Sequence, residues 1–256
     1  MHAPVLCVYF AEIEQVNTSK MGRNNFFQFK QFIVIQEKAA MKVGIDGVLL
    51  GSWARLNGAE HVLDVGTGTG LLSLMAAQRS GAMVDAVELE ADAAMEARLN
   101  FQQSKWALRI RLTVGAFQAF QADKKYDHIL CNPPFFDNSQ KSNDQKRTQA
   151  RHSDSLSLKE LLEGASRLLA EHGKMSLILP ADKELRLFEL ASALNLYVVR
   201  ITKVASDESR TAHRILAELC RKPAELLESD LVIRDQATGE YSAAYRQLTK
   251  DFYLAF

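Results

Sequence analysis

Hydrophobic positions follow two spacings that alternate along most of the chain. Short apolar runs such as 61–65 and 83–87 are typical of strands, and apolar residues three or four positions apart in the segments between them are typical of helices. Strands that alternate with helices form parallel sheets with right-handed crossovers. The predicted series is strand 61–65, helix 71–78, strand 83–87, helix 90–104, strands 110–114 and 126–131, helix 157–169, strand 174–179 and helix 185–194.

Both ends of this series follow other patterns. Strands 197–204 and 215–220 have no crossover helix between them, so we expect an antiparallel pair at one edge of the sheet. Aromatic and β-branched residues at 27–34 predict short strands, and an apolar face after Asp46 predicts a short helix with Asp46 as its N-cap. The expected fold class is α/β: a Rossmann-like, mostly parallel seven-stranded sheet with an antiparallel last strand and helices on both faces.

A chain of 256 residues with 47% hydrophobic content can bury one substantial core with an appendage. We predict an N-terminal extension at 1–22 and one domain at 23–256, which includes accessory strands at 23–58 and a mixed tail at 221–256. The apolar stretch 5–10 is too short to span a membrane and leads to no cleavage site, so a cytoplasmic protein without a membrane partner is expected.

Composition excludes several classes of site. The three cysteines, Cys7, Cys131 and Cys220, lie far apart, and the six histidines show no ligand spacing, so neither a disulfide framework nor a metal is expected. Lys plus Arg equals Asp plus Glu at 31 each, so any binding of nucleic acid must depend on a local patch.

A glycine-rich turn follows the first strand of the series. It reads Asp-Val-Gly-Thr-Gly-Thr-Gly, with Asp64, Gly66, Gly68 and Gly70, and the next strand leads to Glu88, whose carboxylate could accept hydrogen bonds from two ribose hydroxyls. The spacing differs from the GxGxxG of dinucleotide sites, and an acid ahead of the turn disfavours a pyrophosphate. The same acid favours the cationic amino and sulfonium groups of S-adenosylmethionine. A turn that only packs the helix against the strand is the simpler alternative.

A second candidate motif, Asn132, Pro133, Pro134 and Phe135, follows strand 126–131 at the carboxyl edge of the sheet. Two prolines stiffen the turn and leave carbonyl oxygens free to accept hydrogen bonds. The side-chain oxygen of Asn132 and the backbone oxygen of Pro133 could hold both N–H bonds of an adenine amino group, while Phe135 stacks on the base. Alone, the motif would be a rigid turn; after the glycine turn and Glu88, it predicts catalysis.

These two motifs resemble those of Rossmann-like class I methyltransferases, and the second resembles the [ND]PP[YF] signature of amino-group methyltransferases. Three longer stretches resemble the bacterial tRNA1(Val) (adenine(37)-N6)-methyltransferase family: residues 63–90, FKQFIVIQEKAAMKVGIDGVLLGSW at 29–53, and LVIRDQATGEYSAAYRQLTKDFYLAF at 231–256. The resemblance implies a class I methyltransferase fold and methyl transfer from S-adenosylmethionine to N6 of the adenine beside the anticodon of a valine tRNA, with no obligate protein partner.

The resemblance also implies roles for individual residues. The glycines of the turn would contact the methionine portion of the cofactor, and Lys42, Gly44 and Asp46 would close its site from the N-terminal side. Where such enzymes often have an acid beside the cofactor's adenine, this chain has Ala116 and Phe117, so that contact is missing or is replaced by stacking on Phe117. RNA contact is expected from the basic residues after the catalytic turn, Lys141, Lys146, Arg147 and Arg151.

Two other functions remain open at this point. An amide methyltransferase that modifies a release-factor glutamine uses the same asparagine-proline turn, although such enzymes usually carry a helical N-terminal domain. A cofactor-binding module that recognises RNA without catalysis is the non-enzymatic alternative. A second basic set is interpreted as an ordinary solvated surface: Arg200, Lys203, Arg210, His213 and Arg214.

Overall fold

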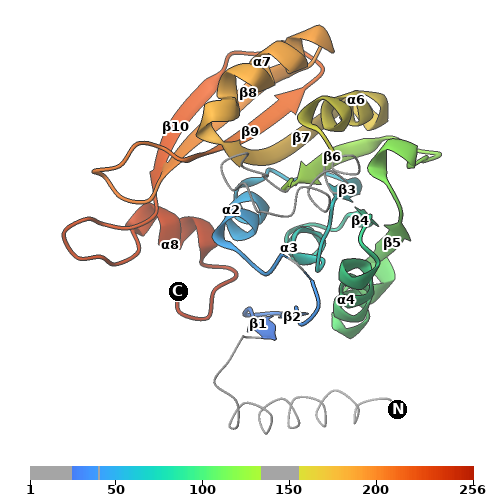
Figure 1. Cartoon of the computed structure of the whole chain (residues 1–256), viewed down its shortest axis with the longest axis horizontal. Helices are drawn as coiled ribbons and strands as arrows, with labels where there is room; N and C mark the ends of the chain where they lie inside the picture. The colour runs from blue at the N-terminus through green and yellow to red at the C-terminus, as the bar shows by residue number, and fades with distance from the viewer. Residues whose placement is uncertain (1–24, 40, 134–155) are drawn as a thin grey trace, which may run out of the picture.

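The computed structural model describes residues 25–39, 41–133 and 156–256 (Figure 1). The predicted N-terminal extension, the catalytic candidates Pro134 and Phe135, and the basic segment that holds Lys141, Lys146, Arg147 and Arg151 lie outside the described residues.

One mixed sheet forms the centre of the molecule, with strand order β10-β8-β9-β7-β6-β3-β4-β5. Neighbouring strands pair in parallel except for β9, which is antiparallel to both β7 and β8. The predicted α/β class, with a mostly parallel sheet and an antiparallel strand near its end, is therefore confirmed. The strands are β3 (His61–Val65), β4 (Met83–Glu88), β5 (Ile110–Val114), β6 (Tyr126–Cys131), β7 (Leu169–Pro180), β8 (Tyr197–Ala205), β9 (Arg214–Cys220) and β10 (Leu227–Val232).

The sheet differs from the sequence prediction at its C-terminal side. It has eight strands rather than seven, because β10 lies within the segment expected to be a mixed tail and pairs in parallel with β8. Four of the six β10 residues are exposed, as befits an edge strand, so their hydrophobicity gives no strand pattern. The expected antiparallel pair exists, but it lies inside the sheet rather than at its edge.

Helices cover both faces of the sheet (Figure 1). Two hydrophobic clusters, one on each face, form the core. No helix among the described residues is both long and apolar enough to cross a membrane. One face carries α2 (Ile45–Trp53), α3 (Leu71–Arg79), α4 (Ala91–Gln103) and α8 (Ala243–Thr249), and the other carries α6 (Leu158–Leu168) and α7 (Glu184–Ala193).

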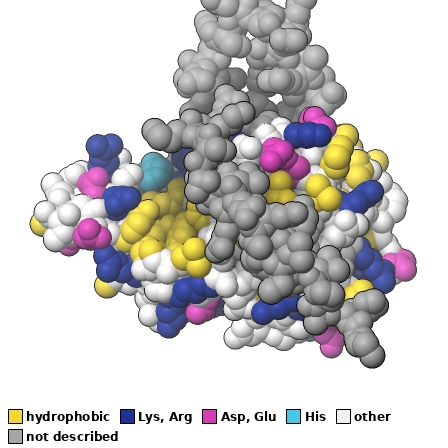
Figure 2. Space-filling model, turned by 90° about the horizontal axis from the view of Figure 1, so that it is seen from below, with side chains coloured by type: hydrophobic (Ala, Val, Ile, Leu, Met, Phe, Trp, Pro, Cys, Tyr) yellow, Lys and Arg dark blue, Asp and Glu magenta, His cyan; other side chains and the backbone are white. Residues whose placement is uncertain are grey.

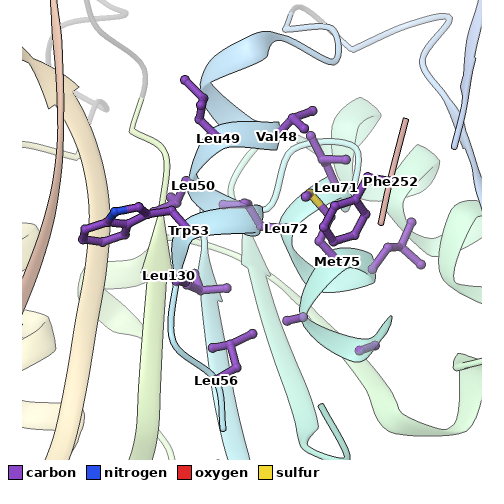
Figure 3. Packing of buried hydrophobic residues seen from close by; sticks show 14 of the residues in the cluster. Val48, Leu49, Leu50, Trp53, Leu56, Leu71, Leu72, Met75, Leu130 and Phe252 are labelled. Carbon is purple, nitrogen blue, oxygen red and sulfur yellow. The ribbon is translucent and has the colours of Figure 1, made fainter. Parts of the chain in front are cut away.

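Helix α2 is buried along nearly its whole length. It packs on α3 through Leu71 and Met75, while the ring of Trp53 points away from α3 (Figure 3). A Cβ on Gly51 would lie 2.5 Å from the sulfur of Met75, so glycine permits this close approach. The prediction that Asp46 is the N-cap is wrong: Gly44 occupies that position, and Asp46 lies in the first turn, where its carboxylate pairs with Arg214.

The N-terminal accessory strands are β1 (Phe26–Gln28) and β2 (Ile33–Ile35), which form a separate antiparallel pair. Their aromatic residues pack against the C-terminal segment, where the Phe29 ring lies 6.4 Å from Phe252. Lys30 Nζ donates to the Lys250 carbonyl at 2.7 Å. The accessory strands are therefore joined to the C-terminal end of the chain rather than to the main sheet.

Candidate active site

Four predicted site segments meet at one edge of the sheet. Strands β3, β4, β5 and β6 are parallel neighbours, with Val65 opposite both Val87 and Cys131, and Glu88 opposite Val114. The glycine turn, Glu88, Ala116 and Asn132 follow the ends of these strands, so they lie side by side at the carboxyl edge, where open α/β sheets bind ligands.

Glycine is needed in the turn for two different structural reasons. Gly66, Gly68 and Gly70 have φ angles of 68°, 57° and 91°, a region that L side chains adopt at a cost. A Cβ on Gly66 or Gly68 would meet nothing within 4 Å, whereas one on Gly70 would collide with the ring of Phe101. Gly66 and Gly68 therefore border open space in which a ligand could approach the backbone, and Gly70 permits packing against α4.

Asp64 lies fully buried beneath this turn. Its Oδ2 accepts hydrogen bonds from Thr67 Oγ1 at 2.5 Å and from Ser73 Oγ at 2.7 Å. Its Oδ1 has no hydrogen-bond partner in the structure. Burial raises the pKa of Asp64 to about 6, and the hydrogen bonds from Thr67 and Ser73 only partly oppose this rise. The site therefore contains a buried carboxylate with a spare acceptor and no internal cation on it among the described residues.

Glu88 links the turn to the end of β4. Its Oε2 accepts the amide of Gly68 at 2.7 Å, and its Oε1 accepts the amide of Glu90 at 2.9 Å. Each carboxylate oxygen has a second lone pair, so the group retains the capacity to accept two ribose hydroxyls. The predicted position of Glu88 beside the glycine turn is thereby matched by its hydrogen bonds.

Asn132 and Pro133 follow β6 and are both half-buried. The structure records no hydrogen bond from the Asn132 amide to any described residue, so that amide can still engage a substrate. The preceding residue, Cys131, is 1% exposed, and burial raises the pKa of its thiol, so this side chain serves packing.

Helix α2 brings the N-terminal candidates toward the same edge. A Cβ on Gly47 would lie 3.7 Å from Nδ2 of Asn132 and 2.8 Å from Cδ2 of Leu71. Asp46 precedes Gly47, and Gly44 is the N-cap of the helix, while Lys42 lies exposed just before it. Sequence reasoning gave no role to Gly47, because nothing in the local pattern shows which helix will face Asn132.

Ala116 and Phe117, the residues predicted to lie beside the cofactor's adenine, have less open surroundings than the glycine turn. Ala116 follows β5 and is half-buried, whereas the Phe117 side chain is 4% exposed within the cluster beneath α6. A Cβ on Gly164 of α6 would collide with the Phe117 ring. The structure therefore provides a packing role for that ring.

Side chains of α4 fix the segment that precedes α2. Glu96, 4% exposed, accepts the amides of Lys38 and Ala39 at 2.6 Å and 2.9 Å. Asn100 donates to the carbonyls of Ile35 at 2.9 Å and Thr69 at 2.8 Å. These contacts tie the accessory segment to the glycine turn, and no sequence motif indicates them.

The second basic set is mostly paired within the protein. Arg200 is buried and bonds to Glu218, Arg214 pairs with Asp46, and Arg210 pairs with Asp207. The expectation that this set forms a solvated surface is therefore wrong for Arg200. On the visible part of the face in Figure 2, lysine and arginine side chains are scattered among acidic and hydrophobic ones.

The described residues suit S-adenosylmethionine. Open space at Gly66 and Gly68, the unpartnered Oδ1 of Asp64 and the carboxylate of Glu88 match a methionine portion, a cationic centre and a ribose. A depression of about 710 Å³ at the opposite, amino edge of the strands, lined among others by His61, Arg79 and Met83, involves none of the predicted site residues. No group of three or more His, Cys, Asp or Glu suited to a metal occurs in the described part of the chain.

Comparison with known proteins gives relatives over most of the chain. Residues 48–208 match the family described as the methyltransferase small domain. A tRNA1(Val) (adenine(37)-N6)-methyltransferase from Bacteroides thetaiotaomicron is 41% identical over 233 residues, which cover 90% of this chain and 98% of the relative. A protein of the same name from Aliivibrio fischeri is 43% identical over 229 residues, covering 89% and 97%.

Solved structures share the fold at low sequence identity. A predicted O-methyltransferase from Agrobacterium tumefaciens has a TM-score of 0.64 at 17% identity and covers 81% of this chain and 96% of that chain. A glycopeptide N-methyltransferase complexed with S-adenosyl-L-methionine has a TM-score of 0.51 at 16% identity, with coverage of 71% and 90%. Both are similar to this chain in architecture.

Proposed function

Because this chain belongs to the tRNA1(Val) (adenine(37)-N6)-methyltransferase family, we propose that it methylates N6 of adenine 37, beside the anticodon, in a valine tRNA. One observation carries the proposal beyond the relatives: Asn132 and Pro133 end β6 at the same sheet edge as the glycine turn and Glu88. A cofactor held by that turn would therefore have its reactive group near the asparagine-proline motif.

Cofactor binding in this proposal uses the open side of the turn. Asp64 faces the cationic part of S-adenosylmethionine, Glu88 accepts the ribose hydroxyls, and Gly66 and Gly68 allow close approach of the methionine portion. Gly70 supports the turn through its packing. Lys42, Gly44 and Asp46 close the site from the N-terminal side, and Ala116 and Phe117 border the cofactor's adenine through the backbone after β5.

Bound S-adenosylmethionine supplies an electrophilic methyl group on a sulfonium. Oδ1 of Asn132 and the carbonyl oxygen of Pro133 accept the two N–H bonds of the substrate amino group, whose lone pair is otherwise delocalised into the adenine ring. Holding both bonds favours a pyramidal nitrogen in line with the methyl group, so the contribution of the protein is orientation and fixed electrostatics. The new N–C bond replaces the S–C bond, and one amino proton leaves to solvent.

In this proposal, RNA is bound by an aromatic residue and by a set of basic residues. Phe135 stacks on the flipped base, which partly offsets the stacking lost when the base leaves the loop. Lys141, Lys146, Arg147 and Arg151 contact phosphates, because these four cations follow the catalytic turn directly in the sequence. Replacing Lys146, Arg147 and Arg151 together should weaken tRNA binding and flatten its dependence on salt.

A methyl-transfer assay tests the activity. Unmodified valine tRNA and a release factor are incubated separately with the purified protein and labelled S-adenosylmethionine, and the modified nucleoside is identified by mass spectrometry. We expect N6-methyladenosine in the tRNA and no label in the release factor. The Asn132→Ala variant should lose about 100-fold or more in turnover while still binding the cofactor in calorimetry.

Three results would contradict the proposal. Label in a release-factor glutamine instead of tRNA would support the amide methyltransferase, and cofactor and tRNA binding without turnover would support a recognition module. In cells, bulk tRNA from a strain lacking the gene should lose N6-methyladenosine at one position of a valine tRNA, and unchanged tRNA would exclude this substrate.

A further inference from the structure

An ion pair with the sheet holds the first turn of helix α2. Arg214 Nε lies 2.9 Å from Oδ2 of Asp46, and the two side chains are 29% and 21% exposed. Arg214 begins β9 opposite Pro180, the last residue of β7, and therefore stands at the carboxyl edge of the sheet. Partial burial reduces solvent screening, so this pair constrains the helix more than a fully exposed pair would.

The other end of α2 is fixed by two further arginines. Arg79 Nη1 donates to the carbonyls of Gly51 at 2.6 Å and Ala54 at 2.8 Å. Arg200 Nη2 donates to the Trp53 carbonyl at 3.2 Å, and its guanidinium lies 3.4 Å from the centre of the Trp53 ring. These contacts satisfy carbonyls that a helix C-terminus leaves unpaired, so the C-terminal end of α2 cannot move independently of the core.

Between these two anchors, Gly47 is the residue of α2 that faces Asn132 and the start of α3. A Cβ on Gly47 would lie 3.7 Å from Nδ2 of Asn132 and 2.8 Å from Cδ2 of Leu71, so this face of α2 lies beside the Asn132 amide. Figure 3 shows the hydrophobic packing of the residues that follow Gly47, with Val48 and Leu49 above Leu50 and Trp53. The position of α2 therefore bears on the surroundings of the Asn132 amide.

We propose that Arg214 is a positioning residue for methyl transfer. Through Asp46 it fixes the first turn of α2, with Gly47 against Asn132, and so holds the amide in the orientation in which Oδ1 accepts the substrate amino group. This role rests on the proposed function, because it acts through Asn132 and not on the cofactor or RNA.

Steady-state kinetics of Arg214→Gln and Arg214→Lys test this role. At saturating S-adenosylmethionine, Arg214→Gln should lower kcat about tenfold or more, because small displacements of a reacting group have large effects on rate, while KM for tRNA stays within about twofold. Arg214→Lys retains a cation that can pair with Asp46 and should recover part of kcat. The matched control is Arg210→Gln, which breaks an exposed ion pair with Asp207 in the adjoining loop and should leave kcat unchanged.

Coupling to Asp46 is tested with a double-mutant cycle. If Arg214 acts through Asp46, adding Arg214→Gln to Asp46→Asn should lower kcat no further than the lower of the two single variants. Additive losses would overturn the proposal. A raised KM for tRNA with a flattened salt dependence in Arg214→Gln would also overturn it, because Arg214 would then contact a phosphate.

A readout independent of turnover separates this inference from the proposed function. The side-chain amide signals of Asn132 can be assigned in ¹⁵N spectra from their loss in Asn132→Asp. Arg214→Gln and Gly47→Ala should shift or broaden these signals, whereas Arg210→Gln should not. If tRNA methylation fails in the wild type but the shifts occur, the positioning contact stands without the proposed activity; unshifted signals in a folded Arg214→Gln variant would refute the contact itself.

Discussion

Two buried carboxylates, Asp64 and Glu218, lie in different halves of the same sheet and have opposite surroundings. Asp64 is 0% exposed, accepts hydrogen bonds from Thr67 and Ser73 and keeps one oxygen unpartnered. Glu218 is 1% exposed and has a cation on each oxygen, with Lys174 Nζ at 3.0 Å and Arg200 Nη2 at 3.0 Å.

This difference separates a ligand site from a structural network. Glu218 has its charge balanced inside the protein, and its neighbour His128 stays neutral because burial lowers the pKa of His128 to about 4. Asp64 lacks such a partner among the described residues, so burial raises its pKa instead. A buried carboxylate with an unpartnered oxygen beneath open glycine backbone is therefore suited to a cation from outside.

The largest expected effect is on the Glu218 side of this comparison. Glu218→Ala leaves Arg200 buried without its charge partner and should lower the free energy of unfolding by about 3–5 kcal/mol in urea denaturation. The control is Glu189→Ala, which removes the partner of Arg186 from an exposed pair and should cost about 0.5 kcal/mol or less. Similar losses for the two variants would show that burial does not distinguish these pairs.

On the Asp64 side, the large effect should fall on ligand affinity. Asp64→Asn removes the negative charge but keeps a side chain of the same shape, so calorimetry should show about 10- to 100-fold weaker binding of S-adenosylmethionine. Urea denaturation of the unliganded variant should show no loss comparable to that of Glu218→Ala. Unchanged cofactor affinity would remove Asp64 from the proposed site.

The pH dependence of cofactor affinity sharpens the same point. Because the pKa of Asp64 is about 6 and the cofactor needs the ionised form, binding should weaken about tenfold between pH 7 and pH 5. Asp64→Asn should flatten this profile. A wild-type profile that is already flat would mean that Asp64 does not meet the cofactor cation.

Stability without ligand should respond to pH in the opposite direction. The folded pKa of Asp64 lies above its ordinary value of 3.8, so its contribution to stability is present below that value and is lost as pH rises through about 6. Thermal melting of wild type and Asp64→Asn across this range isolates the contribution of Asp64, and bound S-adenosylmethionine should counteract the loss.

The smallest expected effect separates two glycines of the turn. Gly68→Ala should cost about 1 kcal/mol through its positive φ alone, because no atom occupies the space of the new methyl group. Gly70→Ala adds a collision with Phe101, so Phe101→Leu should restore part of its stability but none of that lost in Gly68→Ala. Denaturant midpoints of Gly68→Ala and Gly70→Ala, each with and without Phe101→Leu, give the comparison. Equal rescue of the two glycine variants would contradict it.

Much of the fold follows from local pattern. The strand bounds 61–65, 110–114 and 126–131 are predicted as observed, because short apolar runs between turn residues specify buried strands. Helix α6 begins after Ser157. The Ser157 side chain and Glu160 form a capping box there, which a serine at the N-cap permits. The edge strand β10 escapes prediction because its stability comes from pairing with β8 rather than from its own apolar face.

By itself, the sequence determined the order of strands and helices, the glycine turn, Glu88 at a strand end and the asparagine-proline motif after β6, since each depends on neighbours in the chain. Only the tertiary structure decided that Asp64 keeps an unpartnered oxygen, that Glu218 pairs with Arg200 and Lys174, that Gly47 faces Asn132, and that Asp46 pairs with Arg214. The reason is physical: charge balance and close packing depend on residues that are distant in sequence and become neighbours only when the sheet and its helices assemble.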